Sequence, residues 1–223
     1  LLFAPTPTAV ENLRREGIPD AQVFLVGDVM YDAALHFAAL AERRSDILAQ
    51  AGLQPRAYVL ATVHRAENTD DPARLRAIFT GLDRVAGKLP VVVPLHPRTR
   101  AALTHIEGGE ALLQRCRIIP PVGYLDMIML EQGAALIATD SGGVQKEAFF
   151  YQVPCVTLRD ETEWTELVDC GWNRLAPPDS AKVVEEAIRL SLRTTPGPAP
   201  TLYGDGHAGE RIIDILCDRV ATH

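Results

Sequence analysis

Two loop segments of the sequence combine charged and hydrogen-bonding side chains in a way that suits an anionic ligand. The first covers residues 62–68 and places His64 and Arg65 directly after a short apolar run. A guanidinium can bind a phosphate through two parallel hydrogen bonds, and an imidazole can donate a further one. We therefore predict that His64 and Arg65 contact an anion. Glu67 and Asn68 are equally consistent with organising the turn before the next helix.

The second segment covers residues 139–147 and places two glycines at the expected start of a helix. Because they lack a Cβ atom, Gly142 and Gly143 let backbone N–H groups approach a ligand, and a helix N-terminus favours phosphate. Glu147 follows one turn later, where its carboxylate can accept hydrogen bonds from ribose hydroxyls. The pattern is neither a Walker A motif nor a complete G-x-G-x-x-G fingerprint. Its position after a buried strand favours phosphate binding over a plain tight turn.

Two further loops carry polar side chains with less distinctive spacing. His96 lies between two prolines that stiffen its loop, and it is as consistent with a structural histidine as with a ligand contact. Residues 159–164 and 171–173 hold several charges and two tryptophans. From these residues alone we predict a solvated loop.

The elements that position these loops follow a β-α-β-α rhythm. Short, nearly continuous apolar runs are typical of parallel strands that helices cover on both faces. They predict strands at 22–26, 58–62, 91–94, 117–119, 134–139 and 154–158. Apolar residues at helical spacing predict helices at 31–51, 72–88, 99–107, 124–131, 144–151, 181–192 and 208–220. The fold class is therefore α/β, a doubly wound Rossmann-like domain with a parallel sheet, in which ligands bind where strands end and helices begin.

Composition excludes several classes of protein. The chain has 223 residues and a formal charge of −7, so it has no basic surplus with which to bind the phosphate backbone of a nucleic acid. No apolar run reaches the roughly 18 residues that would predict a membrane span. The opening residues do not resemble a signal peptide. The four cysteines include no C-x-x-C pair, which favours a reduced, cytoplasmic protein.

Taken together, the motifs resemble the non-hydrolysing UDP-N-acetylglucosamine 2-epimerase family. The matching blocks occur in family order over nearly the whole chain: FAPT at 3–6, GDVMYD at 27–32, TVHRAEN at 62–68, PLHP at 94–97, PPVGY at 120–124, DSGGVQKE at 140–147, TEW at 162–164 and YGDG at 203–206. Members have two Rossmann-like domains in a glycosyltransferase-B-like arrangement, with the active site between them. The resemblance covers only the C-terminal portion of that architecture.

The resemblance implies a division of this chain into three parts. Residues 1–52 would come from the N-terminal domain and the interdomain region, residues 53–194 would form the UDP-binding domain, and residues 195–223 would be a linker and a crossover helix. The missing N-terminal domain would supply the catalytic carboxylates, so the isolated chain is expected to be inactive. The full-length protein would be a homodimer.

The resemblance also implies a reaction and a set of residue roles. The family inverts C2 of the sugar by eliminating UDP to a 2-acetamidoglucal and then adding UDP back. Here the phosphates would lie on Ser141, Gly142 and Gly143, and the ribose on Glu147. His64 would act at the diphosphate as the catalytic residue, with Arg65 beside it. A possible activator site for a second UDP-sugar would use Arg65 and His96. No metal or NAD is expected.

Three departures from the family pattern bear on substrate. Ala66 stands where many members have a second arginine, which weakens the prediction of an activator site, and Lys146 stands where many have glutamate. Trp164 replaces an arginine that can contact the nucleotide, and it resembles a subgroup that includes epimerases of UDP-2,3-diacetamido uronic acid sugars. A glycosyltransferase domain and a stand-alone UDP-binding module are the alternatives. Retaining glycosyltransferases often carry a second glutamate eight residues before the first, where this chain has Thr139.

Overall fold

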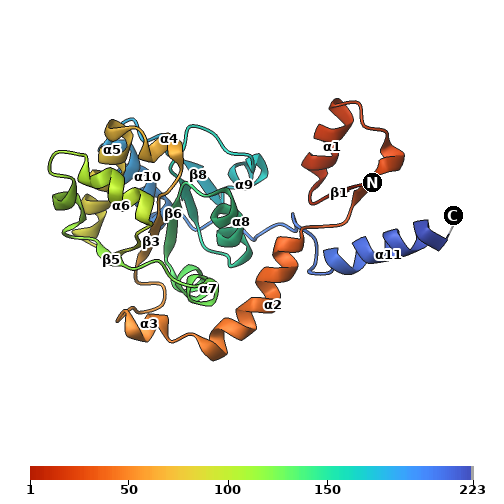
Figure 1. Ribbon diagram of the computed structural model, residues 1–223, viewed down its shortest axis with the longest axis horizontal. Helices are drawn as coiled ribbons and strands as arrows, with labels where there is room; N and C mark the ends of the chain where they lie inside the picture. Colours follow the sequence, from red (N-terminus) through yellow and green to blue (C-terminus); the bar gives the residue numbers. More distant parts are fainter. Residues whose placement is uncertain (222–223) are drawn as a thin grey trace. The chain divides into compact units, whose positions relative to one another are not determined.

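The computed structural model describes residues 1–221 and divides them into two compact units (Figure 1). The smaller unit combines Leu1–Leu40 with the described residues from Pro200 onward, and the larger unit is Ala41–Ala199. The two compact units divide the chain at 40/41 and 199/200. The domain boundaries at 52/53 and 194/195, which rest on the family resemblance, stay predictions. Among the described helices, none combines the length and apolar character that crossing a bilayer requires.

The larger unit is built on a parallel sheet of six strands in the order β5-β4-β3-β6-β7-β8. The strands are β3 (Val59–Thr62), β4 (Val91–Pro94), β5 (Arg117–Ile119), β6 (Leu136–Thr139), β7 (Cys155–Thr157) and β8 (Asn173–Leu175). From β3 the chain winds outward to β5, and from β6 it winds outward on the other side to β8. The predicted doubly wound α/β fold is confirmed. Its topological switch point lies between β3 and β6.

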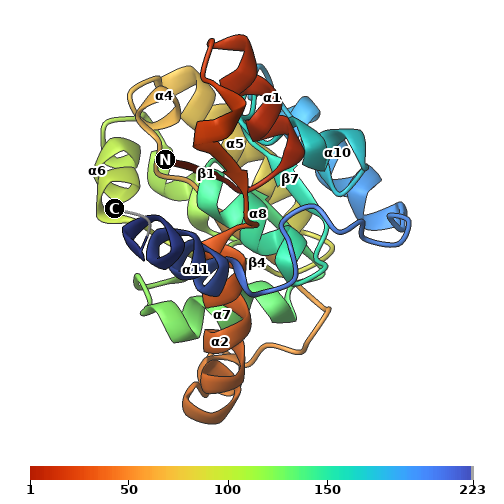
Figure 2. The ribbon, with the colours of Figure 1, turned by 90° about the vertical axis from the view of Figure 1, so that its right-hand side faces the viewer.

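Helices cover both faces of this sheet (Figure 1 and Figure 2). Because successive side chains of a strand point to opposite faces, Val59 and Ala61 join one apolar cluster while Tyr58 and Leu60 join the other. The first cluster includes side chains of α5 (Pro72–Ala86) and α10 (Ala181–Arg193). The second includes side chains of α7 (Tyr124–Gly133) and α8 (Gly142–Phe150). Burial on both faces explains the continuous apolar runs of the strands.

Local signals explain where α5 begins and how closely it packs. The Asp71 side chain accepts hydrogen bonds from the backbone N–H groups of Ala73 and Arg74, and Pro72 occupies the first turn. Farther along, a Cβ on Gly81 would lie 2.8 Å from side-chain atoms of Val184 in α10. Glycine therefore permits the close approach of these two helices.

The single helix predicted at 31–51 is wrong, because the chain breaks it at Ser45. The structure has α2 (Val29–Arg44) and then α3 (Ile47–Gln50). The Ser45 hydroxyl accepts a hydrogen bond from the N–H of Ile47 and donates one to Asp126 at 2.5 Å. A serine side chain thus offers the backbone an alternative to the helical hydrogen bond, and its partner lies 81 residues away.

Several short elements were not predicted, since three to nine residues give a weak periodic signal. In the larger unit they include β8, α4 (Ala66–Thr69), α9 (Thr165–Asp169) and the 3₁₀ helix Gly109–Leu113. The helix predicted at 99–107 is present as α6 (Pro97–Thr104). In the smaller unit the elements that were not predicted are β1 (Leu2–Ala4), α1 (Pro7–Arg15) and the 3₁₀ helix Asp20–Gln22. The strand predicted at 22–26 is present as β2 (Val23–Leu25), which pairs in parallel with β1.

The last helix, α11 (Ala208–Ala221), is tied to the start of α2 within the smaller unit. The N–H of Gly209 donates to the Asp32 carboxylate at 2.7 Å, and the N–H of Asp28 donates to the carbonyl of Tyr203 at 2.9 Å. These bonds join segments that are more than 170 residues apart in sequence.

Candidate functional site

The loops that follow β3 and β6 are joined by one buried carboxylate, that of Asp140. Its side chain is fully buried, and both of its oxygens accept the backbone N–H of His64, at 3.1 and 3.0 Å. One oxygen also accepts the N–H of Arg65 at 3.0 Å and the Asn68 amide at 3.1 Å. The two loops meet because register pairs Thr62 with the residue before Asp140. Asp140 therefore fixes the backbone that carries His64 and Arg65.

The two predicted histidines lie side by side at this edge of the sheet. The ring centroids of His64 and His96 are 5.8 Å apart, and His64 Nδ1 lies 3.5 Å from an Asp140 oxygen. His96 also has a structural role, because its Nδ1 accepts the backbone N–H of Arg98 at 3.2 Å and caps α6. Its other ring nitrogen is left for a ligand. The structural and the ligand-binding interpretations of His96 are thus compatible.

A pocket of about 190 Å³ opens beside these histidines within the larger unit. Its lining includes His64, His96, Pro121, Val122 and Val144. A lining that combines apolar side chains with two imidazoles suits a heterocycle that is attached to an anion.

The α8 N-terminus supplies backbone donors next to the same loops. Ser141 is the N-cap residue, but its side chain makes no capping hydrogen bond, and its own N–H donates to the Thr139 hydroxyl at 2.9 Å. Gly142 and Gly143 are the first residues of the helix, whose opening N–H groups have no partner within it. These donors and the helix dipole favour an anion at this point.

Glu147 lies one turn farther along α8 and is half-buried. Burial raises the pKa of its carboxyl above the ordinary value, and the positive charge of Lys146 partly offsets this. Glu147 follows Val144, which lines the pocket, by three residues, so the two side chains share one face of the helix. A carboxylate here can accept hydrogen bonds from a ligand that reaches from the pocket to the helix N-terminus.

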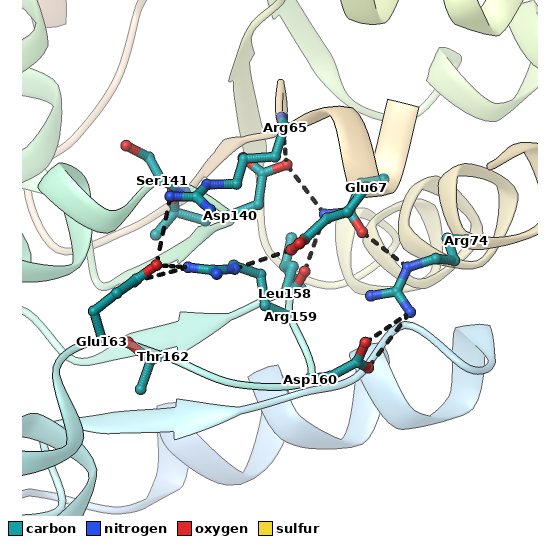
Figure 3. Close-up of polar contacts among 12 residues, drawn as sticks. Arg65, Glu67, Arg74, Asp140, Ser141, Leu158, Arg159, Asp160, Thr162 and Glu163 are labelled. Atoms are coloured by element: carbon teal, nitrogen blue, oxygen red, sulfur yellow. Dashed lines mark hydrogen bonds and ion pairs between the residues drawn. The ribbon is translucent and has the colours of Figure 1, made fainter. Parts of the chain in front are cut away.

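An ion-pair network locks the loop after β7 to the loop after β3 (Figure 3). The Arg159 side chain is buried and donates from Nε to Glu67 at 2.9 Å and from Nη1 to Glu163 at 2.9 and 3.1 Å. These hydrogen bonds from Arg159 lower the pKa of Glu163. Arg65 lies farther from Glu163, with Nη2 3.7 Å from its carboxylate. Arg65 is therefore only loosely held.

The prediction that residues 159–164 and 171–173 form a solvated loop is only partly right: Asp160, Glu161 and Glu163 are exposed, whereas Arg159, Trp172 and Asn173 are buried. The Trp164 indole donates to the carbonyl of Gly142 at 2.9 Å, and the Lys146 ammonium lies 4.3 Å from the centre of its ring. Thr162 donates to the buried Gln145 side chain at 2.6 Å, which joins the loop to α8. Residues 173–175 form β8. The loop thus packs against the N-terminal turn of α8.

The structure brings the sequence-predicted residues to one edge of the sheet: His64, Arg65, His96, Ser141, Gly142, Gly143 and Glu147. Their ligand roles stay predictions. Sequence reasoning missed the organising roles of Asp140, Gln145 and Arg159. Polar residues directly after buried strands were a signal for Asp140 and Arg159, whereas Gln145 inside a helix gave none. Within residues 1–221, no three His, Cys, Asp or Glu side chains converge as a metal site would require.

Comparison with known proteins gives a consistent result. The model of the UDP-N-acetylglucosamine 2-epimerase family matches residues 1–217. The chain is 48% identical to UDP-2,3-diacetamido-2,3-dideoxy-D-glucuronate 2-epimerase of Pseudomonas aeruginosa, over 97% of this chain and 59% of that protein. It is 42% identical to a UDP-N-acetylglucosamine 2-epimerase homolog of Methanococcus maripaludis, over 97% of this chain and 60% of that protein.

A solved structure is similar over the same extent. The crystal structure of Methanocaldococcus jannaschii UDP-GlcNAc 2-epimerase in complex with UDP-GlcNAc and UDP superposes with a TM-score of 0.86 at 40% identity. The match covers 97% of this chain and 60% of that one. The chain therefore spans about 60% of the length of the relatives it matches.

Proposed function

The chain belongs to the UDP-N-acetylglucosamine 2-epimerase family, and we propose that it is the part of such an enzyme that binds UDP, the leaving group. One observation carries the proposal. The α8 N-terminus, His64 and the loosely held Arg65 lie together at the switch point of the sheet, where an α/β domain binds its ligand. The M. jannaschii relative, crystallised with UDP-GlcNAc and UDP, supports this choice of ligand.

In this proposal each part of UDP has its own partner. The diphosphate lies on Ser141 and the Gly142 and Gly143 N–H groups, with Arg65 turning from Glu163 toward it. Glu147 accepts hydrogen bonds from the ribose hydroxyls. The uracil occupies the pocket between the histidines and Val144.

His64 is the residue that acts on the reaction itself. When the C1–O bond breaks, its electron pair stays on the departing phosphate oxygen, and the C2 proton is removed to give the 2-acetamidoglucal. A hydrogen bond from His64 stabilises the charge that develops on the diphosphate. Protonation of C2 on the opposite face and re-addition of UDP then complete the inversion. The group that moves the C2 proton lies outside this chain, so we expect no turnover by the 223 residues alone.

A second substrate is favoured by a specific observation. The 48% identical P. aeruginosa relative acts on a UDP-2,3-diacetamido uronic acid sugar by name, and Trp164 is the departure that singled out this subgroup. We therefore propose UDP-N-acetylglucosamine as one substrate and the diacetamido uronate as the alternative. A catalytic metal, NAD and nucleic acid have no part in the proposed reaction, and the full-length enzyme is proposed to be a homodimer.

Calorimetric titration of the purified chain with UDP tests the binding proposal. We expect saturable 1:1 binding of UDP, and much weaker binding of ADP because the pocket must accept a larger base. No heat with UDP, or equal affinities for UDP and ADP, would contradict it. Incubation with each UDP-sugar, followed by separation of the epimers, tests the expected lack of turnover.

A further inference from the structure

We propose that Asp140 is a positioning residue that acts through His64: it holds the imidazole with Nδ1–H toward its carboxylate and Nε2 toward the diphosphate. The inference rests on the proposed function, because it assumes that the ligand of this loop is a nucleoside diphosphate. Asp140 itself touches no ligand in this scheme. It determines which ring nitrogen does.

The backbone geometry fixes the position of the ring. The carboxylate holds the N–H groups of both His64 and Arg65, and the Asn68 amide spans from Asp140 to the carbonyl of Leu158 at 3.0 Å. The loop therefore cannot shift away from the end of β6 without leaving a fully buried carboxylate short of donors. Rotation of the imidazole about its own bonds is the freedom that remains.

The ring already points one nitrogen at Asp140. His64 Nδ1 lies 3.5 Å from the carboxylate oxygen, which is longer than a good hydrogen bond, while the His64 side chain is 43% exposed. Catalytic hydrogen bonds are often long without substrate and shorten when it binds. The nitrogen that does not face Asp140 is thus the one available to a ligand. In a neutral imidazole, the hydrogen bond that one ring nitrogen makes decides whether the other nitrogen carries a proton.

The charges around the ring make this orientation consequential. Two titratable side chains face His64, the Asp140 carboxylate and the His96 ring, and Arg65 is its neighbour in sequence. A diphosphate at the α8 N-terminus would place a second anion on the far side of the imidazole. A protonated imidazole donates from both nitrogens. A His64 ring in that form would hold Nδ1–H on Asp140 and donate from Nε2 to the departing oxygen.

Nuclear magnetic resonance of the full 223-residue chain, with ¹⁵N-labelled histidine, tests the orientation without any ligand. The chain has six histidines, and His64→Gln identifies the signal of His64 by its loss. An ordinary imidazole is neutral at about pH 9, and long-range ¹H–¹⁵N spectra at that pH report which nitrogen is protonated. We expect Nδ1–H, whereas an unconstrained side chain prefers Nε2–H. Predominant Nε2–H, or an even mixture of the two forms, would overturn the proposal.

The variant Asp140→Asn tests the cause. We expect the His64 signal to change to Nε2–H and UDP affinity to fall by about fivefold to tenfold. The control Asp160→Asn removes a carboxylate that pairs with Arg74 in the same group of loops, and it should leave the tautomer unchanged. An Nδ1–H form that persists in folded Asp140→Asn would refute the role of Asp140. If that variant does not fold, the wild-type spectrum still shows whether His64 carries Nδ1–H, as the proposal requires.

These outcomes separate the inference from the proposed function. If UDP does not bind to the wild-type chain but His64 carries Nδ1–H, the ligand assignment fails and the positioning of the ring stands. If UDP binds and His64 carries Nε2–H, the function stands and the role of Asp140 fails.

Discussion

Replacement of Glu147 by glutamine removes one charge from the proposed ribose site and keeps the size of the side chain. A hydrogen bond to a charged group contributes about 1.5–3 kcal/mol when its partner is desolvated. Glu147 is half-buried, and screening by water can lower the smaller of these values to about 1 kcal/mol, so we expect a loss of about 1–3 kcal/mol in UDP binding. Since 1.4 kcal/mol is a factor of ten, Kd should rise by about fivefold to 150-fold. Glu147→Ala should lose at least as much.

The pH dependence of this loss is a sharper test than its size. Burial raises the pKa of Glu147, so the carboxylate becomes protonated at a higher pH than an exposed glutamate would. Ribose hydroxyls donate to the charged form, and wild-type affinity should fall as the pH decreases through that raised pKa. Glu147→Gln has no such transition. The ratio of wild-type to variant affinity cancels every titration that the two proteins and the ligand share, and it should decrease toward one in acid.

Calorimetry with UDP between about pH 4.5 and pH 8 measures both effects. Circular dichroism at each pH checks that the chain is folded. Glu161→Gln is the matched control, because Glu161 is an exposed carboxylate on the neighbouring loop. Unchanged UDP affinity in Glu147→Gln would refute the ribose assignment. An equal loss in Glu161→Gln would show that net charge, and not a hydrogen bond, sets the affinity.

Three other changes test the packing, the buried charge and the reaction. Gly81→Ala should destabilise the fold by about 1–3 kcal/mol in urea unfolding, because its Cβ would meet Val184 at 2.8 Å, whereas Gly87→Ala, with 3.5 Å to its nearest atoms, should be nearly neutral. Glu131 is fully buried, neither carboxyl oxygen has a partner, and burial raises its pKa well above normal. The folded state therefore holds this proton more tightly than the unfolded state, and stability falls as pH rises above the unfolded pKa. Glu131→Gln should lessen that fall and gain about 1–3 kcal/mol over wild type at pH 8; equal unfolding curves at pH 5 and pH 8 in wild type would contradict this. In an enzyme that contains this chain, His64→Ala should lower kcat more than it raises KM, and a change in KM alone would exclude the leaving-group role.

The central part of the site could be predicted because it depends on neighbouring strands. Both β3 and β6 are buried at all four positions, which makes them readable as apolar runs. Parallel strands end at the same edge of a sheet, so polar residues that follow two neighbouring strands must meet. Register then pairs Thr62 with Thr139, whose hydroxyls lie 2.6 Å apart, and brings His64 to the α8 N-terminus.

The loop after β7 could not be predicted, because its burial depends on partners that are distant in sequence. Arg159 contacts Glu67 across 92 residues, and no local pattern shows that this arginine meets a carboxylate there. Charged residues in a run are usually solvated, and burial of a charge is tolerated only when it is paired and hydrogen-bonded. Distant partners also explain why the single helix predicted at 31–51 is wrong. The helix ends at Arg44, and the next residue, Ser45, donates a hydrogen bond to Asp126.

The ion pairs that Arg159 and Arg65 make with carboxylates also decide which of these two arginines can bind a ligand. Arg159 is 5% exposed and its hydrogen bonds go to two carboxylates, so turning it toward a phosphate would leave Glu67 and Glu163 without their main partner. Arg65 is 37% exposed at the side chain, and its contact with Glu163 is 3.7 Å long. Its release costs little, because Glu163 keeps Arg159 when Arg65 leaves. Both residues are arginines near acidic residues in the sequence. Only their contacts in the structure show that Arg159 is a structural cation and that Arg65 can bind an anion.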